Sequence, residues 1–301
     1  MISWLIVAIL AYLFFGLGSF GDKLVLDGKP KPKSYTFYVG VFGLSTLLLI
    51  PFVNFSLPTS IALAWIILNA IVRILGTYAM FVALEKFDVS RVMATIGATQ
   101  PIFIFILTWI FWGPQAMTMT DILAFILLFL GSVIISIEKN IKITKGYLKI
   151  TTFASLMFSL SIIFTKLVFE SQDFIQGTIW MCVFVFLFTL FLLFSKKTRK
   201  EIFAKKMVSN EKTQKAFLLA QVSGGVANFL QGYSIYLAPV VFLAVINSLR
   251  GIQYIFLFLI TLFTSFFLPK LLKEDLSTRI IFQKIISIII IAAGLAMLAI
   301  Y

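Results

Sequence analysis

The sequence predicts an all-α membrane protein in which ten transmembrane helices form two inverted five-helix repeats. Three observations lead to this fold class. First, 61% of the 301 residues are hydrophobic and 34 are phenylalanine, with a mean hydropathy of +1.06, which is far more apolar than a soluble domain. Second, the apolar residues fall into segments long enough to cross a bilayer. Third, part of the first half recurs in the second half after an odd number of segments.

The apolar segments define the ten predicted spans in order. The first span begins at the N-terminus without a basic start or a small-residue cleavage site, so we interpret it as a helix and not as a removable signal. The lone Cys182 lies in an apolar segment and is interpreted as a packing residue. The predicted spans cover residues 2–21, 35–53, 60–84, 90–112, 120–137, 149–169, 175–194, 216–236, 239–268 and 280–300.

Basic residues alternate between loops and so predict the orientation. Of the 25 Lys and Arg residues, all except Arg73, Lys166 and Arg250 lie in or beside the first, third, fifth, seventh and ninth loops. The tendency of cytoplasmic loops to be positive predicts a multi-pass protein of the cell membrane with both termini outside. The net charge of +13 is therefore attributed to topology and to membrane lipids as partners, and nucleic-acid binding is not expected.

The longest basic loop, Lys196–Lys215, mixes six Lys and Arg residues with apolar residues in its first half. Two interpretations remain open for it, namely a short interfacial helix on the inner leaflet and a solvated basic loop. Within the spans, Lys166 is interpreted as a residue at a helix end that extends toward water near Glu170 and Asp173.

An internal repeat explains the even number of spans. Shifting the sequence by 143 residues places Ala11–Gly28 over Ala154–Ser171, so that Lys23-Leu24-Val25 matches Lys166-Leu167-Val168 and Asp27 matches Glu170. Five spans separate the copies, so the two halves must cross the membrane in opposite directions. The predicted repeats are residues 1–140 and residues 147–301.

The segment Pro239–Leu268 is predicted to be one apolar helix with Arg250 near its middle. About 30 residues at ~1.5 Å each would span about 45 Å, more than the hydrocarbon core. Asn247, Gln253 and Tyr254 lie three or four residues from Arg250 and so share its face of the helix.

Arg73 and Arg250 are the two charges predicted near the bilayer centre, and every Asp and Glu lies at the end of a span. An unpaired arginine at that depth costs at least about 2.5–3.5 kcal/mol, so each requires polar partners or a ligand. Guanidinium groups bind carboxylate and phosphate well, which favours an anionic or zwitterionic ligand. The alternative is that both arginines brace the bundle. Proton-coupled efflux of cations is disfavoured because histidine and central carboxylates are absent.

Polar residues at matching depth complete the predicted substrate site. Asn69, Arg73 and Thr77 follow each other at helical spacing, and a shift of 150 residues aligns Gln100-Pro101 with Arg250-Gly251. Aromatic residues that could flank a ligand are Tyr12, Trp65, Tyr78, Tyr233 and Tyr254. The predicted substrate-binding residues are Arg250, Gln100, Asn247, Gln253, Tyr254, Arg73, Asn69, Asn228 and Gln231; no catalytic or metal-binding residues and no cofactor are predicted.

Residues 78–107 and 232–260 carry a family resemblance. Each passage has aromatic residues, an Ala-Leu or Leu-Ala pair, a tight turn and a helix with small residues or proline. With the closing helices around Gly131 and Gly294, they resemble the EamA-like transporters of the drug/metabolite transporter superfamily. Many members carry a glutamate after the fourth and ninth helices, whereas this sequence has Gln115 in the first copy and Glu274 in the second.

The resemblance implies a ten-helix bundle whose central cavity is lined by helices 1, 3, 4, 6, 8 and 9. With the charge pattern, it predicts a secondary transporter that moves a small anionic or zwitterionic metabolite, such as an amino acid or a phosphorylated metabolite, by alternating access. An enzyme is not expected. The alternative is a lipid-handling or scaffold membrane protein with structural arginines. The expected oligomeric state is a monomer or homodimer.

Overall fold

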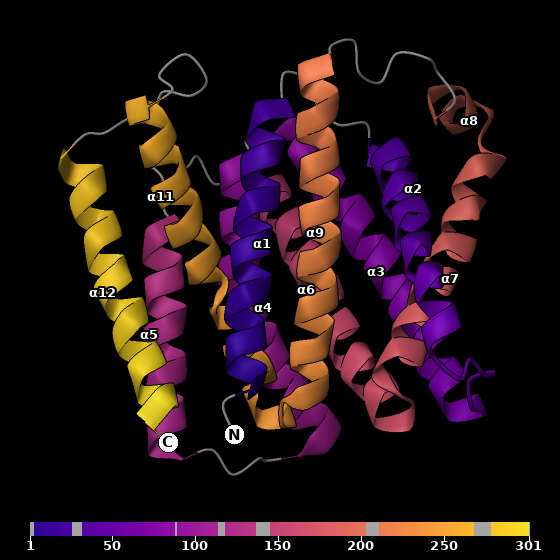
Figure 1. Cartoon of the computed structure of the whole chain (residues 1–301), viewed down its shortest axis with the longest axis horizontal. Coiled ribbons are helices and arrows are strands. Elements are labelled where there is room, and N and C mark those ends of the chain that lie inside the picture. Colours follow the sequence, from indigo (N-terminus) through magenta and orange to yellow (C-terminus); the bar gives the residue numbers. More distant parts are fainter. Residues whose placement is uncertain are drawn as a thin grey trace.

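The computed structural model describes residues 3–25, 32–87, 89–113, 118–136, 145–202, 211–267 and 278–300, and within these ranges every regular element is a helix (Figure 1). Seven of the described helices are long and apolar enough to cross a membrane, and Met119–Ile135 and Phe282–Leu298 are shorter apolar helices. The predicted all-α, multi-pass membrane class is therefore confirmed. Asp27, Gln115 and Glu274 lie outside the described residues, as does the side chain of Lys23.

The first half contains five helical segments that coincide with the predicted spans. Thr59 ends the loop before the third helix, and its hydroxyl accepts the N–H of Ala62 at 3.3 Å, a normal N-cap. The second segment begins as an α-helix and tightens into a 3₁₀-helix that contains Pro51. The elements are α1 (Ser3–Val25), α2 (Pro32–Gly43), η1 (Leu44–Phe52), α3 (Ser60–Lys86), α4 (Val89–Trp112) and α5 (Met119–Ser136).

The second half again contains a helical segment for each predicted span, and adds a short helix in the long basic loop. The ninth predicted span is wrong in detail, because it is not a single helix but is interrupted at Leu249. The elements are α6 (Lys145–Ser171), α7 (Phe174–Thr189), η2 (Leu190–Phe194), α8 (Lys196–Ile202), α9 (Glu211–Leu237), η3 (Val240–Phe242), α10 (Leu243–Ser248), α11 (Arg250–Phe267) and α12 (Thr278–Ile300).

The long helices stand side by side in one bundle (Figure 1). In its middle α1 packs along α9 and α3 packs along α6, while α4 lies against α6 and α10. One edge is formed by α5 and α12, and the other by α2, α7 and α8. The start of α1 and the end of α12 lie at the same end of the bundle, and α8 lies at the other end.

Lys166 shows that the expected extension toward water is wrong. Its side chain is buried, and its Nζ donates to the carbonyl oxygens of Ala238 at 2.7 Å, Ile235 at 3.2 Å and Tyr236 at 3.4 Å. The last carbonyls of a helix have no partner within the helix and carry partial negative charge. Lys166 of α6 therefore caps the C-terminal end of α9 instead of reaching solvent.

Candidate functional site

The helix that carries Arg250 is broken immediately before it. α10 ends at Ser248, Leu249 has φ −67° and ψ −2°, and α11 begins at Arg250. The N–H of Leu249 is shared between the carbonyls of Val245 at 3.2 Å and Ile246 at 3.3 Å. The break lies in the middle of the apolar segment Val240–Ile260, where each freed backbone group needs a partner from the protein.

Ser132 of α5 supplies that partner. Its hydroxyl donates to the carbonyl of Ser248 and accepts the N–H of Gly251 at 2.9 Å, so one side chain bridges the two sides of the break. A Cβ added to Gly251 would lie 2.5 Å from both Ser132 Oγ and Ile291 Cδ1. Glycine at this position therefore allows α5 and α12 to approach the broken helix closely.

Arg250 is the centre of a polar cluster that joins four helices. Its Nη2 donates to Oε1 of Gln100 on α4 at 3.0 Å. Gln100 is buried, and its backbone carbonyl accepts the hydroxyl of Ser159 on α6 at 3.2 Å. The other terminal nitrogen of Arg250, Nη1, is buried and has no hydrogen-bond partner. The guanidinium thus retains an unmatched donor.

Tyrosine hydroxyls surround the same guanidinium. Tyr12 of α1 is buried and accepts Nε2 of Gln231 on α9 at 3.1 Å, and Tyr254 donates to the carbonyl of Met93 at 3.3 Å. Both hydroxyls lie close enough to Arg250 to interact with its charge. Tyr12 was predicted only as an aromatic residue beside the ligand, because its place between α9 and α11 depends on packing that the sequence does not display.

Asn247 and Gln253 lie on either side of Arg250 in the chain and have separate partners. Gln253 Nε2 donates to Ser19 Oγ on α1 at 2.9 Å. Asn247 Nδ2 donates to the carbonyl of Leu243 at 3.0 Å within its own helix, and its buried Oδ1 has no partner. The cluster therefore contains an unmatched donor on Arg250 and an unmatched acceptor three residues earlier.

The remaining predicted residues are not hydrogen-bonded to this cluster. Asn69 Nδ2 donates to Thr165 Oγ1 at 2.9 Å and to the carbonyl of Ser161 at 2.7 Å, both on α6. Asn228 is exposed and bonds the carbonyl of Gly224 in its own helix at 2.7 Å. Arg73 is half-buried, and no ion pair joins it to a described acid. The sequence spacing of Asn69 and Arg73 thus gave a shared helix face but no shared contact.

The chemistry available at Arg250 is recognition of an anion. Among the described residues, its side-chain contacts are with the amide of Gln100 and with tyrosine hydroxyls, and none is with a carboxylate. The described ranges also contain no group of three or more His, Cys, Asp or Glu side chains that could hold a metal. A guanidinium with a free donor can receive a carboxylate or phosphate oxygen.

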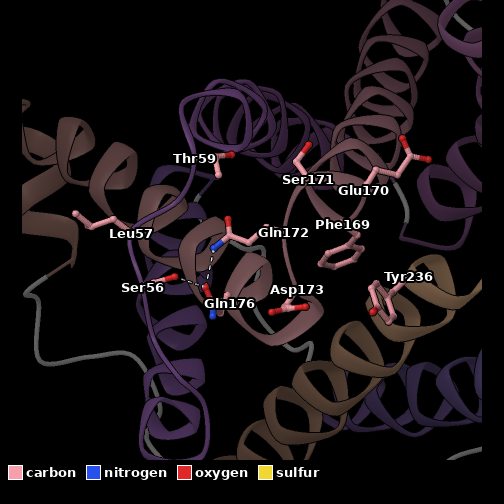
Figure 2. Close-up of a pocket in the computed structure, with 10 residues that line it drawn as sticks. All are labelled: Ser56, Leu57, Thr59, Phe169, Glu170, Ser171, Gln172, Asp173, Gln176 and Tyr236. Atoms are coloured by element: carbon pink, nitrogen blue, oxygen red, sulfur yellow. Dashed lines mark hydrogen bonds between the residues drawn. The ribbon is translucent and has the colours of Figure 1, made fainter.

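An open hollow of about 460 Å³ lies elsewhere, around the turn between α6 and α7 (Figure 2). Ser56 and Gln172 both donate to Gln176 Oε1, at 2.9 and 3.2 Å. None of the predicted site residues lines this hollow, so it is distinct from the buried cluster at Arg250. Its lining residues are Ser56, Leu57, Thr59, Phe169, Glu170, Ser171, Gln172, Asp173, Gln176 and Tyr236.

Comparisons with known proteins agree with this architecture. A solved chain described only as the crystal structure of a protein superposes with a TM-score of 0.68 at 11% sequence identity, over 99% of this chain and 96% of that chain; this likeness concerns the fold alone. No curated protein matches the sequence. Residues 2–137 match the EamA-like transporter family. Over these residues the chain belongs to the EamA-like membrane transporters, in agreement with the predicted drug/metabolite transporter superfamily.

Proposed function

We propose that the chain is a secondary transporter of a small anionic or zwitterionic metabolite, such as an amino acid or a phosphorylated metabolite, and that Arg250 binds the anionic group. The observation that carries this proposal is the buried, unpartnered Nη1 of Arg250 at a break in a membrane helix. Half-helix ends and unwound backbone near the bilayer midplane are the usual construction of substrate sites in transporters.

The energetics favour a ligand in place of a protein counter-ion. A guanidinium stays charged at any physiological pH, and placing it at the bilayer centre costs at least about 2.5–3.5 kcal/mol. Gln100 and the tyrosines offer neutral partners only. An anionic group that reaches Nη1 would neutralise the charge and form a charge-assisted hydrogen bond.

The inner shell of the proposed site consists of Arg250 and the residues that contact it or lie beside it: Gln100, Asn247, Gln253 and Tyr254. Gln231 acts through Tyr12, with which it shares a hydrogen bond. Asn69, Arg73 and Asn228 are proposed as positions that a ligand meets on its way through the bundle, because they lie on helices that pack around the centre.

Two sets of contacts support the proposed inverted repeats of residues 1–140 and 147–301. A Cβ on Gly131 would meet Ile291, and a Cβ on Gly294 would meet Leu128. The same shift of 163 residues relates Leu128 to Ile291 and Gly131 to Gly294, so α5 and α12 exchange equivalent contacts, as expected across a two-fold axis. Gln100 and Arg250, aligned by the 150-residue shift, also touch each other.

The Arg250–Gln100 hydrogen bond gives alternating access a concrete form. Gln100 belongs to the first proposed repeat and Arg250 to the second, so rocking of one repeat against the other changes the distance between them. In the state described here both side chains are largely buried and bonded together. We propose that this state is occluded and that a ligand enters when the two repeats separate.

The proposed setting is the cell membrane, with both termini outside and the basic loops in the cytoplasm. A small-molecule substrate and membrane lipids are the proposed partners, without nucleic acid, and the protein acts as a monomer or homodimer. The competing function is a non-transporting or lipid-handling scaffold with structural arginines. The bond between Arg250 and Gln100 favours it, since that bond also serves as a brace.

Thermal unfolding of the purified protein in detergent tests the proposal. The panel contains amino acids, organic acids, sugar phosphates and organic cations, with wild type, Arg250→Gln and the exposed-arginine control Arg199→Gln. A ligand at a hundredfold excess over Kd stabilises by about 2.7 kcal/mol. We expect an anionic or zwitterionic compound to stabilise wild type and the control but not Arg250→Gln. Equal stabilisation of all three proteins, or stabilisation by cations, would contradict substrate binding at Arg250.

A further inference from the structure

The edge of the bundle formed by α7 has an exposed aromatic strip that ends at α8. The rings of Phe188 and Phe191 are 5.9 Å apart, and those of Phe191 and Phe194 are 5.8 Å apart. Phe191 is 61% exposed and Phe194 is 83% exposed. Large apolar side chains exposed at the end of a membrane helix lie in the hydrocarbon, so Phe194 marks its boundary with the lipid headgroups.

α8 begins two residues after Phe194 and is fixed in place. The hydroxyl of Ser195 accepts the N–H of Thr198 at 3.4 Å, and the carbonyl of Ser195 accepts the N–H of Arg199 at 2.9 Å. At the other end of α8, Tyr38 of α2 donates to the carbonyl of Ile202 at 2.6 Å. Thr198 and Ile202 are buried, so one face of α8 is packed against the protein.

The opposite face of α8 presents cations. Lys196, Arg199 and Lys200 are exposed and are spaced three and four residues apart, which places them on one side of the helix. None of the three forms an ion pair with a described acid. Glu201, the only acid of α8, is half-buried. The face therefore carries net positive charge at the depth where the aromatic strip ends.

We propose that this cationic face of α8 (Lys196, Arg199 and Lys200) binds the phosphate groups of anionic phospholipids. The adjoining Phe191 and Phe194 would contact the acyl chains of the same lipids, so apolar and charged parts match in order. Three cations spread along a fixed helix suit a layer of several headgroups better than one soluble phosphate. This surface is independent of the Arg250 site and of the transport reaction.

The test uses the full-length protein in mixed micelles with phosphatidylglycerol or phosphatidylcholine, and follows thermal unfolding. The variants are Arg199→Gln/Lys200→Gln and the control Lys145→Gln/Lys149→Gln, which removes two exposed cations from the start of α6 at the same end of the bundle. Each cation near an anionic surface contributes about fivefold in affinity. The α8 double variant is expected to need roughly 25 times more phosphatidylglycerol for the same stabilisation, while the control behaves as wild type.

Further arms separate the explanations. Arg199→Lys/Lys200→Arg is expected to keep the phosphatidylglycerol response, and inorganic phosphate or glycerol 3-phosphate is expected to give none. Equal effects of both lipids, an equal loss in the α6 control, or full stabilisation by inorganic phosphate would each overturn the proposal. Unfolding without added lipid shows whether the α8 variant is folded, since its substitutions lie on an exposed face.

Discussion

Arg250 and Lys166 are both largely buried cations in membrane-spanning helices, but their surroundings assign them different roles. Lys166 directs its ammonium group at three carbonyls, so its donors are matched. Arg250 has one matched terminal nitrogen and one unmatched one. The first arrangement stabilises a helix end, whereas the second is suited to binding a ligand.

Lys166→Met is expected to destabilise the protein, although it removes a buried charge. Methionine fills a similar volume but cannot donate, so the carbonyls of Ile235, Tyr236 and Ala238 lose a partner. Leaving buried polar groups unsatisfied costs about 1–3 kcal/mol. Thermal unfolding in detergent measures this loss, with Lys149→Met on the exposed part of α6 as the control. An unchanged midpoint for Lys166→Met would show that the cap is not needed.

At this scale the sequence identified Arg250 and Gln100 because a charge or an amide in an apolar segment stands out. It gave no indication of Ser132 or of the Tyr12–Gln231 contact. Serine and tyrosine are common in apolar helices, and which of them faces a polar partner depends on helices far apart in the chain. The environment of Lys166 was mispredicted for the same reason, since it depends on where α9 ends.

The broken helix is the element that the sequence described least well. Residues 239–268 are apolar without interruption, and Gly251 alone is compatible with a continuous helix, so periodicity predicted one helix. The interruption is stabilised from outside, by Ser132 of α5. Local sequence cannot encode a partner that arrives from another helix, whereas the boundaries of helices that end in polar loops were predicted within a few residues.

Ser132→Ala is expected to weaken this element. It leaves the Ser248 carbonyl and the Gly251 N–H without their partner, at about 1–3 kcal/mol for each group. Ser287→Ala on α12 is the matched control, because Ser287 is equally buried but its hydroxyl bonds only Gln283 of its own helix. Amide hydrogen exchange should increase around residue 251 in Ser132→Ala and not in the control. Equal protection in both would indicate that the break does not depend on Ser132.

For the whole molecule, hydropathy and the internal repeat were sufficient to predict a helical segment at each span. Hydropathy succeeds here because only helices can satisfy their backbone groups within lipid without forming a barrel. The pairing of α1 with α9 and of α3 with α6 is a property of the assembled bundle, and no single segment contains it.

The predicted orientation can be tested with single cysteines in a Cys182→Ser background. Asp173 in the turn after α6 and Arg199 on α8 are both exposed and lie at opposite ends of α7. We expect Asp173→Cys to react with a membrane-impermeant maleimide on intact cells, and Arg199→Cys to react only after permeabilisation. The reverse pattern would place the termini inside.

The lack of a protein carboxylate beside Arg250 has an electrical consequence. An empty carrier that changes state with an uncompensated guanidinium near the membrane centre displaces charge, and one elementary charge moved across 100 mV corresponds to about 2.3 kcal/mol. A bound anion cancels that charge. The empty protein would then respond to membrane voltage while the protein carrying a monovalent anion would not, so the voltage itself would set how quickly the unloaded carrier returns.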